Sequence, residues 1–146
     1  MFGSMQRGVN AYAKVGLETS VISASPHKLI VLLYDGALAA VKNAARHMAA
    51  GEIAEKGVAI GKALDIIDSG LRASLDKKGG GEIAANLDAL YVYMTQRLLT
   101  ASLQNQSAML DEVQVLLADL RDAWMQIGEK PAQQDTMAQA PILASA

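Results

Sequence analysis

The stretch S-A-S-P-H-K-L-I-V-L-L-Y-D-G-A-L, from Ser23 to Leu38, combines the start signals of a helix with a long apolar run. Ser25 is suited to the N-cap, and Pro26 stands at the first helical position, where its missing N–H costs nothing. Residues 29–34 are all apolar. A surface helix needs only one apolar stripe. This helix therefore has apolar side chains for more than one side, and something must cover the second.

The composition favours an all-α protein and excludes several function classes. Of the 146 residues, 51 % are hydrophobic and only 4 % are aromatic, and Ala, Leu and Met are strong helix formers. The formal net charge is −2, and no run of basic residues is longer than Lys77-Lys78, so there is no electrostatic footprint for nucleic acid. The chain has no cysteine, which excludes disulfides and thiolate catalysis.

Two further features of the sequence indicate where in the cell the protein is located. The longest apolar row is much shorter than a bilayer span requires. The first residues lack the apolar core of a secretory signal. We therefore expect a protein of the cytoplasm that is not inserted in a membrane.

Helix boundaries can be read from glycines and from apolar spacing. After the first segment, apolar residues recur at intervals of three and four in three further segments, as on one face of a helix. Gly51, the glycines at 79–81 and Gly128 end segments, and Ser107 is a possible cap for the last one. The predicted helices span residues 25–50, 52–77, about 82–103 and 107–127.

These helices predict an all-α fold, an antiparallel up-down four-helix bundle over residues 25–128. Short connections between consecutive long helices favour antiparallel neighbours. Residues 1–24 are expected to form a separate N-terminal segment that carries a few apolar side chains. Residues 129–146 are rich in Pro, Ala and Gln, and we expect them to be a flexible tail.

The polar residues do not form a recognisable catalytic or metal site. His27 and His47 are the only histidines, and their spacing on one helix puts them about 30 Å apart, too far to share a metal. We expect His27, in the first turn, to be solvated. No nucleophile elbow or strand framework for Ser/His/Asp catalysis is present. The chain is therefore expected not to be an enzyme and to hold no metal or cofactor.

His47 leaves one alternative open, because histidine phosphotransfer domains are four-helix bundles that expose one histidine in mid-helix. Those domains usually have a lysine three residues after the histidine, and then a glycine. Here Ala50 takes the lysine position and Gly51 follows. His47 also lies in the last predicted turn, where the helix dipole favours a protonated histidine. A signalling protein of this kind is an alternative to the interpretation that follows.

The apolar residues exceed what the predicted core needs, and such a surplus usually marks a partner site. Three covers are possible: a second copy in a homodimer without cargo, an amphipathic helix of a partner, or the N-terminal segment of the chain itself. In that segment Val9 and Tyr12 are spaced as on one face of a short helix. The residues predicted from periodicity to line the groove are Ile30, Tyr34, Leu38, Tyr91 and Leu99.

Several short motifs occur in one order along the chain, and their order is more specific than any one of them. They are G-V-N-A-Y at 8–12, S-A-S-P at 23–26, L-Y-D-G-A-L at 33–38, G-G-E-I-A at 80–84, and L-R and A-W within 120–124. Over residues 8–127 the chain resembles the flagellin export chaperone family, FliS.

The resemblance implies a chaperone of the bacterial cytosol that serves type III export of flagellin. Members of this family bind the disordered C-terminal segment of flagellin, which folds into helices around the bundle. Binding blocks premature polymerisation and delivers the subunit to the export gate without ATP. The resemblance also maps the self-cap of the groove to Val9 and Tyr12. Flagellin is the expected client, and an export-gate membrane protein and an anti-sigma factor are further expected partners.

Overall fold

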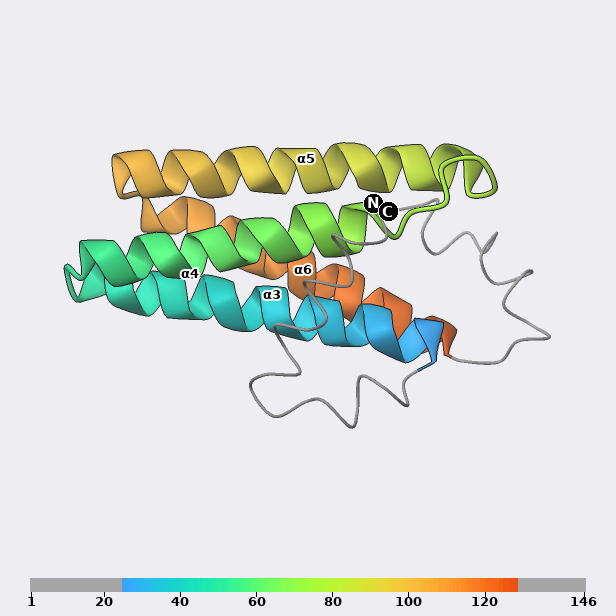
Figure 1. Cartoon of the computed structure of the whole chain (residues 1–146), viewed down its shortest axis with the longest axis horizontal. Helices are drawn as coiled ribbons and strands as arrows, with labels where there is room; N and C mark the ends of the chain where they lie inside the picture. The colour runs from blue at the N-terminus through green and yellow to red at the C-terminus, as the bar shows by residue number, and fades with distance from the viewer. Residues whose placement is uncertain (1–24, 129–146) are drawn as a thin grey trace.

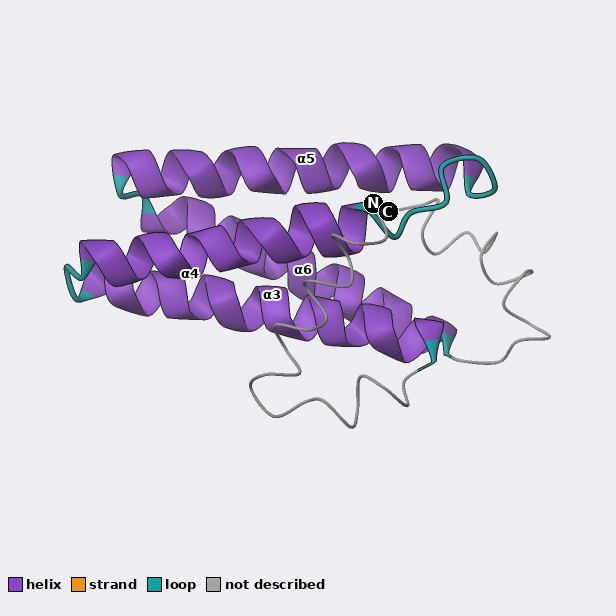
Figure 2. Ribbon diagram, in the orientation of Figure 1, coloured by secondary structure: helices purple, strands orange, loops and turns teal. Residues whose placement is uncertain are grey.

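The computed structural model describes residues 25–128, and within that range it contains helices and no strand (Figures 1 and 2). The predicted N-terminal cap, with Val9 and Tyr12, and the predicted tail both lie outside the described residues. The elements are α3 (Pro26–Ala49), α4 (Ile53–Asp65), the π-helical segment η2 (Ile66–Arg72), α5 (Gly81–Gln104) and α6 (Ser107–Ile127).

The helices form an antiparallel four-helix bundle in which α4 and η2 make one rod, and this confirms the predicted fold class (Figure 1). The side chain of His27, at the start of α3, stacks on Trp124, near the end of α6. Lys56, at the start of α4, binds the backbone of Ser102, near the end of α5. Contacts between the start of one helix and the end of another require that these pairs run in opposite directions.

The start of α3 follows the sequence prediction. Ser25 is the N-cap, and its hydroxyl accepts a hydrogen bond from the backbone N–H of Lys28 at 3.1 Å. Pro26 is the first helical residue. Gly51, with φ of 72°, lies in the turn to α4, where a left-handed conformation favours glycine. The capping signals in the sequence therefore placed both ends of this helix correctly.

The second predicted helix ends earlier than predicted, at Arg72 rather than Lys77. Its last part is π-helical, and the wider turn brings Ile66, Ile67, Gly70 and Leu71 to the core together. The hydroxyl of Ser74 donates to the carbonyl oxygen of Leu71 at 2.7 Å, in competition with helical backbone bonds.

The start of the last helix also differs slightly from the prediction. Ser107 is the first helical residue of α6 rather than its cap, and Gln106 takes the cap position without a side-chain hydrogen bond.

The long apolar run in α3 is explained by the position of this helix, which packs against α4 on one side and α6 on the other. Val31, Leu33 and Tyr34 are buried, whereas Leu29, Ile30 and Leu32 are half-buried. The bundle itself therefore covers much of the second side of α3. The largest fully buried side chains of the core are Leu33, Val41, Ile67, Leu71, Met94, Leu98, Leu110, Val113 and Leu117.

Gly70 lies where η2 packs closely on α3. A Cβ atom on Gly70 would lie 3.0 Å from the Cδ2 atom of Leu33, so a glycine here lets η2 pack closely on the Leu33 side chain of α3. Between residues 25 and 128, no helix is both long enough and apolar enough to span a bilayer.

Candidate functional site

The five residues predicted to line a groove are not exposed together. Tyr34 and Tyr91 lie in the core with 3 % and 2 % of their surface exposed, and Ile30 and Leu38 are half-buried against it. Leu99, on α5, is 50 % exposed. Of the five, Leu99 offers the most surface to a partner, and the other four contribute mainly to packing in this state.

The two buried tyrosines bind each other across the bundle. Their hydroxyl oxygens lie 2.6 Å apart, which links α3 to α5. Burial raises the pKa of Tyr34 to about 12 and raises the pKa of Tyr91 well above its ordinary value, so both phenols stay neutral at physiological pH. Periodicity predicts that both residues line a groove, because it cannot show that each has a partner hydroxyl on another helix.

Exposed apolar side chains mark surfaces that the bundle does not use. On α5, Leu103 is 87 % exposed and lies one turn beyond Leu99. The residues of this kind among those described are Ile53, Val58, Tyr93, Leu99, Leu103, Val115 and Met125. Ile53 begins α4 at the end of the bundle where α5 finishes. We call Ile53, Leu99 and Leu103 the α4–α5 surface.

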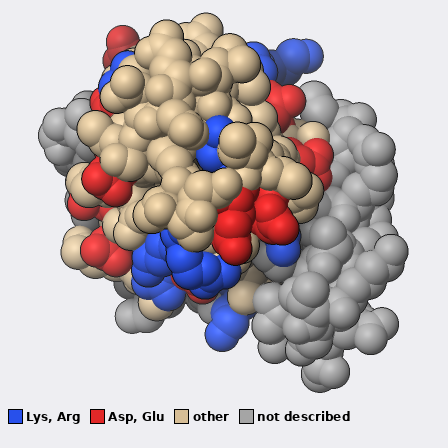
Figure 3. Space-filling model, turned by 90° about the vertical axis from the view of Figure 1, so that its left-hand side faces the viewer, with Lys and Arg blue, Asp and Glu red and all other residues tan. Residues whose placement is uncertain are grey.

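Lys56 fixes this part of the bundle, although no pattern in the sequence indicates this role. Only 5 % of Lys56 is exposed. Its ammonium group donates to the carbonyl oxygen of Ser102 at 3.0 Å and to the side-chain oxygen of Asn105 at 2.8 Å. Asn105 is the left-handed C-cap of α5, so the cation lies where the helix dipole is negative. Figure 3 views this end and shows that residues other than Asp, Glu, Lys and Arg cover much of it.

Ion pairs hold the opposite end of α5 to the π-helical segment. Arg72 Nε lies 2.6 Å from Asp88 Oδ1 and Arg72 also bonds to Asp68. The hydrogen bond from Arg72 lowers the pKa of the Asp88 carboxyl below its ordinary value. The side chains of Arg72 and Asp88 are both partly exposed to solvent, which weakens their attraction, so the pair orients the two elements more than it stabilises them.

A second polar cluster joins α5 to α6. The hydroxyl of Tyr93 donates to Glu112 at 2.5 Å, and Arg97 Nε lies 2.7 Å from the same carboxylate. The hydrogen bond from Tyr93, followed by that from Arg97, lowers the pKa of Glu112. Polar contacts at the edges of α5 therefore add to its buried apolar side, and its outer side carries Leu99 and Leu103.

His27 is buried, so the expectation that it is solvated was wrong. Its ring stacks on Trp124 with centroids 5.3 Å apart, and its Nε2 donates to the Trp124 carbonyl oxygen at 2.8 Å. The Trp124 indole N–H donates back to the carbonyl oxygen of His27 at 3.1 Å. Asp35 and Arg121 form an ion pair between the same two helices. These contacts give His27 a role in joining α3 to α6.

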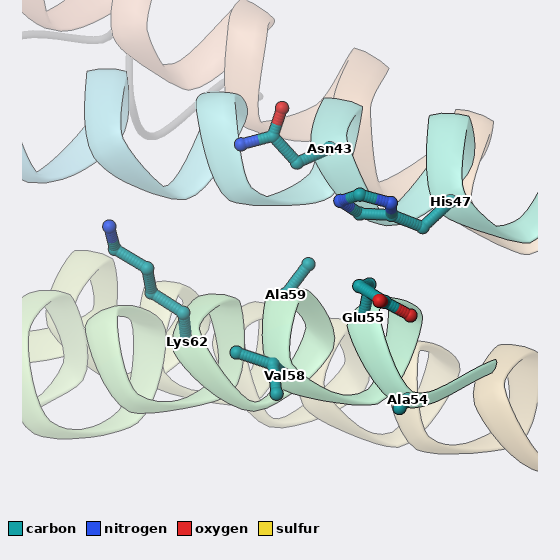
Figure 4. A pocket seen from close by; sticks show the side chains of 7 residues that line it. All are labelled: Asn43, His47, Ala54, Glu55, Val58, Ala59 and Lys62. Atoms are coloured by element: carbon teal, nitrogen blue, oxygen red, sulfur yellow. The ribbon is translucent and has the colours of Figure 1, made fainter. Parts of the chain in front are cut away.

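A groove of about 430 Å³ runs between the outer sides of α3 and α4 (Figure 4). Asn43 and His47 line it from α3, and Glu55, Val58 and Lys62 line it from α4. Nδ1 of His47 donates to Glu52 across the turn at 2.7 Å, which gives this histidine a structural contact. No cluster of three or more potential metal ligands occurs in the part of the chain that the structure describes.

Comparison with known proteins shows which family this chain resembles. The family described as Flagellar protein FliS matches residues 8–131. A flagellar secretion chaperone FliS of Salmonella typhimurium is 47 % identical over 129 residues, which are 88 % of this chain and 96 % of that protein. The FliS of Escherichia coli is 43 % identical over 118 residues, covering 81 % of this chain and 87 % of that protein.

A more distant relative extends the same result. The flagellar secretion chaperone FliS of Bacillus subtilis is 35 % identical over 109 residues, which are 75 % of this chain and 80 % of that protein. The relatives are named as chaperones, which are not enzymes, in agreement with the prediction that this chain has no catalytic activity. The family resemblance found in the sequence motifs is thus confirmed, and the chain belongs to the FliS family of flagellar secretion chaperones.

Proposed function

We propose that this chain is a chaperone of the bacterial cytosol that binds the disordered C-terminal segment of flagellin. It would keep the subunit from polymerising before export and deliver it to the type III export gate. Two observations together support the proposal. The chain belongs to the FliS family, and apolar side chains near the end of α5 are exposed. Flagellin is proposed as the client because the relatives are named for flagellar secretion.

The side chains of the α4–α5 surface are exposed, so a client helix can reach them without rearrangement of the bundle. Leu99 and Leu103 are one helical turn apart on α5, and Ile53 lies at the same end of the bundle, since Lys56 joins the start of α4 to the end of α5. An amphipathic helix with anchors one turn apart can bury all three side chains. The other predicted groove residues, Ile30, Tyr34, Leu38 and Tyr91, are buried or half-buried against the core.

The energetics suit a carrier that must also release its cargo. Burying a Leu or Ile side chain contributes about 1.5–3 kcal/mol. A disordered client loses conformational entropy as it folds on the surface, and this cost offsets much of that gain. The expected affinity is therefore moderate, and binding and release need no ATP.

We also propose that the N-terminal segment competes with the client through Val9 and Tyr12. Both are apolar residues of the motif at 8–12 that the family resemblance assigns to a self-cap. A short segment buries less area than a long client, so the client displaces it. An export-gate membrane protein and an anti-sigma factor complete the proposed partners.

The proposal is tested by anisotropy of a labelled peptide from the flagellin C-terminus. The variant Leu99→Asp/Leu103→Asp should bind at least about tenfold more weakly, because charges replace two apolar anchors. Val115→Asp, at an exposed apolar position on α6, is the control and should bind as the unmodified chain does. Equal binding by all three proteins would refute the assignment to α5.

A further inference from the structure

The edge between α5 and α6 carries two neighbouring apolar side chains that the bundle leaves partly uncovered. Val115 of α6 is 58 % exposed, and Tyr93 of α5 is 39 % exposed. Glu112 accepts the hydrogen bond of the Tyr93 hydroxyl, and Val115 lies three residues after Glu112, on the same side of α6. The two apolar side chains therefore belong to one surface.

Carboxylates stand on both sides of Val115. Asp111 precedes it by four residues and Asp119 follows it by four, so the three side chains lie on one face of α6. Both aspartates are exposed, and between residues 25 and 128 neither of them forms an ion pair. We call Tyr93, Val115, Asp111 and Asp119 the α5–α6 surface. It has an apolar centre and an acidic rim.

Tyr93 is held in place before any partner binds. Its hydroxyl donates to Glu112 at 2.5 Å, and the guanidinium carbon of Arg97 lies 5.8 Å from the centroid of its ring. A side chain that is already ordered loses little conformational entropy on binding. Tyrosine is also one of the residue types enriched among the main contributors to binding energy. Tyr93 is therefore suited to be the central anchor, with Val115 beside it.

The α5–α6 surface is separate from the α4–α5 surface proposed for the client. Tyr93 and Leu99 are six residues apart on α5, which places them about 120° apart around the helix axis. Arg97, beside Tyr93, binds Glu112 of α6, and α6 packs against α3 and α5. A ligand can therefore contact Tyr93 and Val115 without covering Leu99.

We propose that the α5–α6 surface docks an amphipathic helix of a second partner protein, whose apolar residues are flanked by Lys or Arg. Tyr93 and Val115 contact the apolar side of that helix, and Asp111 and Asp119 pair with its basic residues. Pairing of this surface with itself in another copy of the chain would instead place aspartates opposite aspartates. The proposal does not depend on the identity of the client.

Two labelled synthetic peptides test the predicted chemistry of the partner. One is an amphipathic helix built of Leu and Lys, and the other has Glu at every Lys position. In fluorescence anisotropy with the full chain, the Leu/Lys peptide should bind at least about tenfold more tightly than the Leu/Glu peptide, because only its charges complement Asp111 and Asp119. Added salt should weaken binding of the Leu/Lys peptide, because the ion pairs are exposed to solvent.

One pair of substitutions tests the apolar centre. Val115→Arg should weaken binding of the Leu/Lys peptide by at least about tenfold, because it replaces an apolar contact with a charge that repels the peptide. Val58→Arg makes the same change at an exposed valine of α4 and is the matched control. It should bind the peptide nearly as the unmodified chain does. Circular dichroism checks that each variant remains folded.

A second pair of variants tests the acidic rim. Asp111→Lys/Asp119→Lys should also weaken binding of the Leu/Lys peptide by at least about tenfold, because both carboxylates are replaced by like charges. Glu55→Lys/Asp65→Lys changes the net charge by the same amount at exposed positions of α4. Its binding should stay close to that of the unmodified chain. An equal loss in both double variants would show that only the net charge matters and would overturn the proposal.

Further outcomes would also overturn it. They are the absence of binding by the Leu/Lys peptide, equal binding of the two peptides, and α6 variants that bind as the unmodified chain does. If Val115→Arg weakened binding of the flagellin peptide as strongly as that of the Leu/Lys peptide, the surface would belong to the client. If Arg7→Glu/Lys14→Glu, at the basic residues of the N-terminal segment, tightened binding of the Leu/Lys peptide, that segment would be the occupant.

Discussion

Tyr34 and Tyr91 occupy apolar positions of α3 and α5, yet each brings a hydroxyl group into the core. A buried hydroxyl without a partner destabilises the folded state, and here the two hydroxyls satisfy one another at 2.6 Å. The pair therefore specifies how α3 and α5 face each other across the bundle. The free energy of unfolding of the protein should therefore depend on the two hydroxyl groups as a pair.

A double-mutant cycle measures this dependence. Tyr34→Phe and Tyr91→Phe should each lower the free energy of unfolding by about 1–2 kcal/mol, because each leaves the other hydroxyl buried without its partner. The double variant should lose clearly less than the sum of the two. Unfolding in urea gives the values. Additive losses would show that the hydroxyls act independently.

Lys56 is a buried cation whose partners are uncharged oxygen atoms at the end of α5. Lys56→Met keeps most of the apolar stem but removes the donors, and should lower the free energy of unfolding by about 1–3 kcal/mol. Amide hydrogen exchange should accelerate in the last turn of α5, around Ser102 and Asn105. Lys42→Met, at an exposed position of α3, is the control. Unchanged exchange near Asn105 would contradict the role assigned to Lys56.

For the helices, the sequence predicted most of the boundaries that depend on short-range interactions. Ser25 with Pro26, and glycines such as Gly51, placed the helix boundaries because caps and left-handed turns depend on short-range chemistry. The shortened second helix escaped prediction because a π-helical turn does not interrupt the apolar pattern. Leu75, the last residue of that stripe, still packs against the core although it lies beyond the helix.

The candidate site was less predictable than the fold, for a physical reason. Apolar spacing shows that a side chain avoids water but does not show which neighbour covers it. Tyr34 and Tyr91 were therefore predicted to line a groove, although their hydroxyl groups meet inside the bundle, whereas Leu99 is exposed in the structure. The contact of Lys56 with the end of α5 could not be predicted, because no local sequence pattern indicates that a lysine will reach another helix.

The polar contacts between elements predict how the bundle responds to acid. The pKa of Asp88, held by Arg72, and that of Glu112, held by Tyr93 and Arg97, are lower in the folded state than their ordinary values of 3.8 and 4.5. Their contribution to stability is therefore present above those values and is lost as the pH falls through the lower folded pKa. The double variant Asp88→Asn/Glu112→Gln should show a smaller loss of stability between neutral and acid pH.

The measurement is the urea midpoint as a function of pH, and Asp111→Asn, at an exposed position of α6, is the control. The double variant should start with a lower midpoint at neutral pH and converge with the unmodified chain in acid. Parallel curves would show that these carboxylates do not contribute to the acid response.

In the whole molecule, α3 packs against α4, η2 and α6, and the outer faces of α4, α5 and α6 carry exposed apolar side chains. The apolar run that opened the sequence is covered mainly within the bundle, by α4 and α6. The surplus apolar surface lies instead on α4, α5 and α6, with Leu99 and Leu103 on one surface and Val58 on another.

The proposed self-cap predicts competition that one substitution at the N-terminus can reveal. Tyr12→Ala should raise the affinity for the flagellin peptide by about two- to tenfold, because the uncapped site becomes a larger fraction of the free protein. Tyr12→Phe, which keeps the apolar ring, should bind as the unmodified chain does. Titration that shows unchanged or weaker binding for Tyr12→Ala would exclude the self-cap.

The chaperone role is tested most directly by calorimetric titration of the purified chain with a peptide of about forty residues from the C-terminus of its own organism's flagellin, followed in parallel by circular dichroism. The account predicts saturable binding, a large negative heat-capacity change and a gain of helix beyond the sum of the two free components. Absence of binding by a protein that is folded and helical would contradict it.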